Sequence, residues 1–147
     1  MRNSTRGTRV QEEVGFGRVR RFEDLIAWQK GRKLAVDVYR ASRKGAFGHD
    51  LGLSGQVQRA AISIPSNIAE GFERGTHPEF HRFLSTSKGS CAELRTQLYL
   101  ASDLGYLADD EFTPLMAHAE EVGRIIGGLR TAVRRQRDAD RDRTARR

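Results

Sequence analysis

The chain of 147 residues is long enough for one domain, and its 37% hydrophobic residues suffice for a core although 31% of the residues are charged. No run of about 18 apolar residues occurs, so we expect no transmembrane helix, and the basic N-terminus lacks the apolar region of a secretory signal. The formal net charge of +7 lies at the ends, because six arginines and two glutamates in residues 1–21 give +4, seven arginines and three aspartates in residues 134–147 give +4, and residues 22–133 carry −1.

Both ends lack apolar periodicity. We therefore predict a disordered basic N-terminal tail at residues 1–21 and an Arg-rich C-terminal tail at residues 134–147. Such ends either contact a nucleic acid or serve only solubility, and the composition leaves both alternatives open.

A first helix is predicted from about Glu23 to Lys44, because apolar residues recur there at helical spacing. Three glycines interrupt the pattern in the next stretch, residues 45–52, which we interpret as a loop.

The second predicted helix contains a proline. It begins with Ser54 as its N-cap and ends near Gly71 and Gly75. Pro65 lies inside its apolar pattern, where the missing N–H leaves the carbonyl of Ala61 without its donor. We expect the polar side chains around this break, those of Ser63, Ser66 and Asn67, to bond the freed backbone.

Two further helices carry heptad patterns. The third begins at the capping box formed by Thr76 and Glu79, and its apolar or small positions run from Phe80 to Ala101 in steps of four and three residues. The fourth runs from about Asp109 to Val133 with the same rule. Gly89 inside the third helix suggests close approach of a neighbouring helix. Four amphipathic helices without strand signals predict an all-α fold, an antiparallel up-down-up-down four-helix bundle over residues 22–133.

The sequence contains none of the catalytic or metal motifs that such a chain could carry. Glu-x-x-His pairs, a Gly-x-Ser-x-Gly elbow and a phosphate-cradling Gly-x-x-x-x-Gly-Lys-Ser/Thr loop do not occur. We therefore expect no catalytic residues, no cofactor, no metal and no enzymatic activity. The single Cys91 falls on a predicted core position and is expected to be inert, which fits a reducing cytoplasm.

Two sets of residues are candidates for function. Basic residues of the second and third predicted helices and of the C-terminal tail could contact phosphates, the alternative being a solvated, salt-bridged surface. This set comprises Arg59, Arg74, Arg82, Lys88, Arg95, Arg134, Arg135 and Arg137. The second set is predicted to serve helix–helix or subunit contacts. It comprises Ser63, Pro65, Asn67, Glu70, Gly71, Ser90 and Glu93.

Three segments resemble a known family: FEDLIAWQKGRKLAVDVY, QVQRAAISIPSNIAEGFERG and EFHRFLSTSKGSCAELRTQLYLASDLGYL. The chain from Phe22 to Val133 is similar to the bacterial four-helix-bundle family named for open reading frames in 23S rRNA intervening sequences, which is related to the accessory variability determinant of diversity-generating retroelements. It departs from the family at Gly31 and Ser87, where alanine is common. The resemblance implies a homopentameric barrel without enzymatic activity or cofactor. The retroelement relative resembles a basic barrel that binds nucleic acid and a reverse transcriptase.

These observations favour a homo-oligomeric accessory protein that binds nucleic acid electrostatically, with RNA favoured over DNA. The alternative is a structural or protein-interaction scaffold without a nucleic-acid role. The expected partners are further copies of the chain, with a pentamer favoured, RNA or DNA, and a reverse transcriptase or another protein. No membrane partner is expected.

Overall fold

The computed structural model describes residues 19–147, and this part of the chain is all-helical, without a strand. Its elements are the short 3-10 helix η1 (Phe22–Asp24) and the α-helices α3 (Ile26–Ser42), α4 (Gly45–His49), α5 (Leu51–Glu73), α6 (His77–Asp103) and α7 (Asp109–Ala145). Most of the predicted N-terminal tail at residues 1–21, namely residues 1–18, lies outside the described residues.

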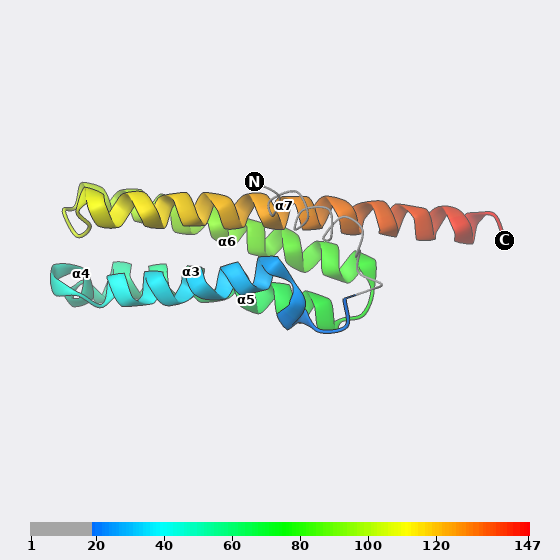
Figure 1. Ribbon diagram of the computed structural model, residues 1–147, viewed down its shortest axis with the longest axis horizontal. Coiled ribbons are helices and arrows are strands. Elements are labelled where there is room, and N and C mark those ends of the chain that lie inside the picture. Colours follow the sequence, from blue (N-terminus) through cyan, green and yellow to red (C-terminus); the bar gives the residue numbers. More distant parts are fainter. Residues whose placement is uncertain (1–18) are drawn as a thin grey trace, which may run out of the picture.

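The four long helices lie side by side along the long axis of the molecule (Figure 1). Helix α5 contacts both α3 and α6, and α7 contacts both α6 and α3. Helix α7 reaches past the other helices at its C-terminal end (Figure 1).

The core lies between these helices and follows the predicted apolar pattern. Every heptad position of α6 from Phe80 to Ala101 is buried, as are the α7 positions from Leu115 to Val133. The largest side chains that are fully buried are Phe47, Phe80, Leu34, Ile64, Ile68, Leu84, Leu94, Leu98 and Ile126. The prediction of the buried faces of α6 and α7 is therefore confirmed.

Helix α5 begins earlier than predicted. Its N-cap is Asp50, whose Oδ1 accepts a hydrogen bond from the Leu53 backbone N–H at 3.1 Å, while its Oδ2 accepts one from the Tyr106 hydroxyl at 2.9 Å. Ser54, the predicted N-cap, lies inside the helix, is buried, and donates to the Asp50 carbonyl at 2.7 Å. The prediction was wrong because Tyr106, distant in sequence, helps to fix the earlier cap.

The predicted loop at residues 45–52 is also partly helical, since it contains α4. Phe47 in α4 is 1% exposed, and its ring stacks on that of Tyr106 with 5.5 Å between centroids. Burial of this side chain stabilises a short helix that its two glycines, Gly45 and Gly48, disfavour.

The Asp50 cap makes stability depend on pH. The Leu53 N–H and then the Tyr106 hydroxyl lower the pKa of Asp50, because both hydrogen bonds favour the carboxylate. A lowered folded-state pKa gives stabilisation that is present above the unfolded value of about 3.9 and is lost as pH falls through the folded value. Asp50→Ala is thus expected to lower the melting temperature near pH 7, with a difference from wild type that shrinks below about pH 4. Thermal melts by circular dichroism at both pH values check this, and a difference that does not change with pH would contradict it.

Helix α7 continues to Ala145, whereas the sequence predicted that it ends at Val133. Ion pairs at helical spacing support this extension: Asp138 pairs with Arg141 at 3.8 Å, and Asp140 pairs with Arg143. Asp140 also lies 2.5 Å from Nδ1 of His77 at the start of α6. The prediction was wrong because a solvated helix needs no apolar stripe. That residues 134–147 form a separate functional unit stays a prediction.

Candidate nucleic-acid interface

A polar seam joins α5 to α6 around the proline. The Ser63 and Ser90 hydroxyls lie 2.8 Å apart, and the Ser87 hydroxyl donates to the Ile64 carbonyl at 2.9 Å. Asn67 Nδ2 donates to both the carbonyl and the hydroxyl of Ser63 at 2.8 Å. These bonds reach the carbonyls of Ser63 and Ile64, whereas the sequence predicted bonds to that of Ala61.

Pro65 lies inside α5 without ending it, and α3 packs closely against it. A Cβ built on buried Gly31 would lie 3.3 Å from Ile64 Cγ2 and 3.8 Å from Pro65 Cβ. The absence of a side chain at Gly31 therefore lets α3 approach α5 at the proline.

A small groove of about 440 Å³ opens beside this seam. Its lining includes one cation, Arg59, and one anion, Glu93, together with Ser63 and Ser90. The structure thus brings four of the sequence-predicted residues together, but their charges balance.

Two other predicted cations lie at the connection between α5 and α6. The guanidinium carbons of Arg74 and Arg82 lie 5.2 and 4.7 Å from the ring centre of Phe83. Each is also paired with a nearby carboxylate, Arg74 with Glu70 at 3.1 Å and Arg82 with Glu79 at 2.9 Å. These pairs fit the alternative of a solvated, salt-bridged surface.

Lys88 and Arg95 lie on the side of α6 that faces α7. They line a groove of about 380 Å³ together with Arg124 of α7. The one carboxylate in the lining is that of Glu120, whose Oε1 lies 3.9 Å from a guanidinium nitrogen of Arg95. Cations therefore outnumber anions in this groove.

Farther along the same two helices, arginines of α7 surround His81 of α6. Burial lowers the pKa of His81, and the positive charges of Arg137, Arg130 and Arg134 lower it further, while the negative charge of Asp138 opposes them. Arg130, Arg134 and Arg137 are spaced four and three residues apart and therefore lie on one side of α7. Their charges add up to raise the positive potential at His81.

We call the row of cations along this junction the α6–α7 basic edge. It consists of Lys88, Arg95, Arg124, Arg130, Arg134 and Arg137. Four of these were among the predicted candidates, whereas Arg124 and Arg130 were missed. The spacing of Arg130, Arg134 and Arg137 was visible in the sequence, but it places them on one side only if the helix continues past Val133.

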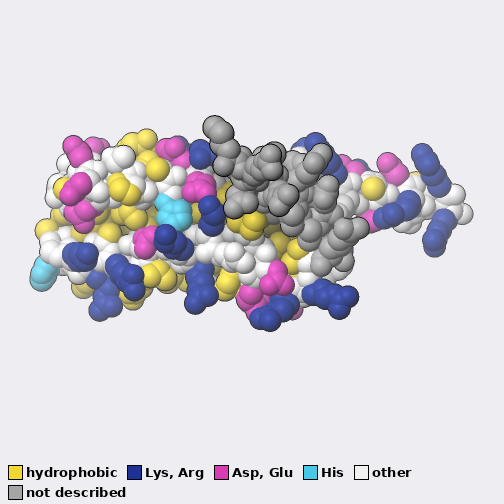
Figure 2. Space-filling model, in the orientation of Figure 1, with side chains coloured by type: hydrophobic (Ala, Val, Ile, Leu, Met, Phe, Trp, Pro, Cys, Tyr) yellow, Lys and Arg dark blue, Asp and Glu magenta, His cyan; other side chains and the backbone are white. Residues whose placement is uncertain are grey.

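The predicted cations therefore do not form one face. Arg59 lies in the α5–α6 groove, Arg74 and Arg82 lie at the α5–α6 connection, and Arg135 is exposed on α7. At the projecting end of α7, Arg side chains are interspersed with Asp side chains (Figure 2).

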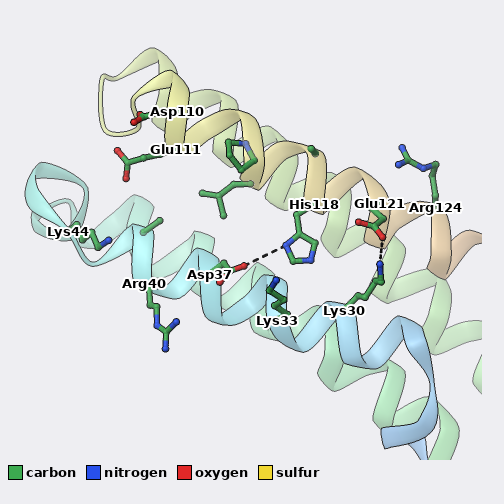
Figure 3. Close-up of a pocket in the computed structure, with 14 residues that line it drawn as sticks. Lys30, Lys33, Asp37, Arg40, Lys44, Asp110, Glu111, His118, Glu121 and Arg124 are labelled. Atoms are coloured by element: carbon green, nitrogen blue, oxygen red, sulfur yellow. Dashed lines mark hydrogen bonds and ion pairs between the residues drawn. The ribbon is translucent and has the colours of Figure 1, made fainter. Parts of the chain in front are cut away.

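A groove of about 910 Å³, larger than the two grooves beside α6, lies between α3 and α7 (Figure 3). An ion pair between Lys30 and Glu121 crosses it, and His118 Nδ1 lies 3.7 Å from Asp37 Oδ2. Its remaining charged residues also mix both signs: Lys33, Arg40, Lys44, Asp110, Glu111 and Arg124. This groove is therefore less suited to an anionic ligand than the α6–α7 basic edge.

The chemistry of the described residues is limited in other respects. No group of three or more His, Cys, Asp or Glu residues within residues 19–147 is placed to hold a metal ion. Cys91 is 3% exposed, and burial raises the pKa of its thiol to about 11, so thiolate is scarce at neutral pH. None of the helices in the described part of the chain has both the length and the apolar character needed to span a bilayer.

Residues 23–128 match the family described as 23S rRNA-intervening sequence protein. No curated protein matches the chain. The matched region includes Lys88, Arg95 and Arg124 but ends before Arg130, so the C-terminal part of the α6–α7 basic edge lies beyond it.

Proposed function

The chain belongs to the 23S rRNA-intervening sequence protein family, and from this membership we propose that it is a non-enzymatic, homo-oligomeric accessory protein that binds RNA electrostatically. The family name supports an RNA-related role. The α6–α7 basic edge is the surface that binds the phosphates, with Arg59, Arg74, Arg82 and Arg135 as peripheral contacts.

The observation that carries this proposal is the excess of cations on the α6–α7 basic edge. At the α5–α6 connection, by contrast, Arg74 and Arg82 are each matched by a carboxylate. Along the edge, Arg95 pairs with Glu120 at 3.9 Å and Arg137 with Asp138 at 3.2 Å, whereas the described residues give Lys88 no ion-pair partner. The six cations of the edge therefore outnumber these carboxylates, and such a row suits a phosphate backbone, because each cation that neutralises a phosphate releases a counterion.

The finer architecture belongs to the same proposal. The protomer is an antiparallel four-helix bundle that assembles into a pentameric barrel in the cytoplasm. Exposed apolar side chains on α5 and α6 support self-association, since Ile62 is 47%, Leu100 48% and Tyr99 51% exposed. Assembly multiplies the basic edges, which raises avidity for one RNA strand. A reverse transcriptase or another protein is a further partner.

The test is a salt series with the full chain and a fluorescein-labelled single-stranded RNA, followed by fluorescence anisotropy. We expect the logarithm of the binding constant to fall linearly with the logarithm of salt concentration, with a slope of about 0.7 per neutralised phosphate. A slope of about 3 or more, with binding that persists near 0.15 M salt, supports the proposal. Absence of binding near 0.15 M salt would overturn it.

A protein-interaction scaffold is the second candidate function. The ion-paired arginines at the α5–α6 connection and the exposed apolar side chains favour it, since neither feature needs a nucleic acid. An oligomer found by light scattering in a protein that fails to bind RNA would select the scaffold.

A further inference from the structure

The groove between α6 and α7 has a floor of very small residues. Cys91 and Ala92 from α6 and Ala119 and Gly123 from α7 line it, so no long side chain fills the space between the helices. A Cβ built on Gly123 would lie 3.8 Å from Cys91 Cβ, an ordinary van der Waals contact. The helices are therefore close at the floor, while the groove above stays open to a small polar group.

The rim of the groove is cationic. Lys88 and Arg95 stand on α6, Arg124 stands on α7, and Glu120 is the one anion of the lining. Glu120 offsets Arg95 only weakly, because their charged atoms are 3.9 Å apart and both side chains are well exposed, at 39% and 44%. The charges of Lys88 and Arg95 also reach the floor, where they oppose the effect of burial on the pKa of Cys91.

Gly127 gives Lys88 its position on the rim. A Cβ built on Gly127 would lie 2.9 Å from Lys88 Nζ, so the lysine side chain crosses from α6 to lie directly over the α7 backbone at this glycine. Any side chain at position 127 would have to displace the ammonium group. The neighbouring Gly128 differs, because a Cβ built there meets nothing within 4 Å.

We infer that this groove is a phosphate seat, in which Lys88 Nζ and the guanidinium groups of Arg95 and Arg124 bind neighbouring phosphodiester groups of an RNA backbone and Gly127 positions Lys88. Lysine supplies a compact positive charge, and arginine supplies paired N–H donors that match phosphate oxygens. The inference rests on the proposed function and assigns to it a particular site and a positioning residue.

The experiment compares three single variants of the full chain with wild type in the RNA salt series. Lys88→Gln is expected to weaken binding about three- to tenfold and to reduce the salt slope by about 0.7, the effect of one phosphate contact. Gly127→Ala leaves every charge in place and displaces only the end of the Lys88 side chain, so it is expected to weaken binding by a smaller factor than Lys88→Gln. Gly128→Ala is the matched control: it makes the same substitution one residue away and should bind as wild type does.

Melting temperatures separate binding from folding. Both glycine variants should be at least as stable as wild type, since alanine favours a helix by about 1 kcal/mol and the displaced atom at position 127 ends a flexible side chain. If Gly127→Ala nevertheless has a lower melting temperature than wild type, the binding of Lys88→Gln alone tests the phosphate seat.

Each remaining outcome is decisive. If wild type binds RNA and both Lys88→Gln and Gly127→Ala bind it as tightly as wild type does, the phosphate seat is wrong and the proposed function stands. If Gly128→Ala weakens binding as much as Gly127→Ala, the effect belongs to the α7 backbone and the seat is again wrong. If wild type itself does not bind RNA, both proposals fall together.

Discussion

Gly71→Ala is expected to lower the free energy of unfolding by about 1–3 kcal/mol, the usual cost of overfilling a well-packed core. Gly71 is buried in α5 where that helix meets α6. A Cβ built there would lie 2.5 Å from Phe83 Cβ and 3.2 Å from Phe80 Cδ1. The first of these atoms is fixed to the α6 backbone, so the helices must move apart, and the loss of packing outweighs the helix propensity gained.

Gly89→Ala is the matched control, because Gly89 is also inside a helix but a Cβ built there meets nothing within 4 Å. It is expected to raise the free energy of unfolding by about 0.5–1 kcal/mol. Urea titrations followed by circular dichroism at one protein concentration measure both values, the fixed concentration being needed because self-association changes apparent stability. Equal stability of the two variants would show that α5 and α6 do not meet tightly at Gly71.

Replacement of Arg130, Arg134 and Arg137 together by glutamine is expected to reduce the salt slope of RNA binding by about 2 and the affinity by about 30-fold or more. The three side chains gather around His81 on the α6–α7 basic edge, so they present adjacent charges to one strand. Fluorescence anisotropy over the salt series measures the change.

The control for this variant is the triple replacement of Lys33, Arg40 and Lys44 by glutamine. These residues line the α3–α7 groove, and their removal takes the same three positive charges from the formal net charge of +7. The control should bind RNA more nearly as wild type does. Equal weakening by both triple variants would mean that total charge, and no particular surface, attracts the RNA.

A second measurement, made without RNA, tests whether the three arginines act on His81. Because the three arginines lower the pKa of His81, their removal should raise it toward its ordinary value near 6.5. A pH titration of the His81 ring resonances by NMR measures the shift. An unchanged pKa would show that the arginine charges do not act on His81.

The sequence predicted the helical part of the fold well because helix formation and burial follow a local period. The heptad positions from Phe80 to Ala101 needed only the 3.6-residue repeat to be assigned to the core, and all are buried. The capping of α6 was also local, since Thr76 Oγ1 accepts from the Glu79 N–H at 3.4 Å. By contrast, the hydrogen bond from Tyr106 to Asp50, the cap of α5, joins residues far apart in the sequence, which a local pattern cannot supply.

The candidate site was less predictable for the same reason. The sequence singled out Lys88 and Arg95, and a local pattern could also have identified the pairs of Arg74 with Glu70 and of Arg82 with Glu79, which stand at helical spacing. It gave no reason, however, to separate Gly127 from Gly128. Which glycine accommodates a lysine depends on the register of α6 against α7, and register is set by the packing of the whole core.

The sequence by itself determined the all-helical class, the buried faces of α6 and α7 and the resemblance to the family that residues 23–128 match, because each depends on a local period or a contiguous motif. The tertiary structure alone decided which charges act together. The charge of Arg137 acts on His81, and the ammonium group of Lys88 lies over Gly127, only because α6 packs on α7 in one register. Electrostatic potential depends on distance through space, and residues far apart in the chain acquire that distance only when the helices pack.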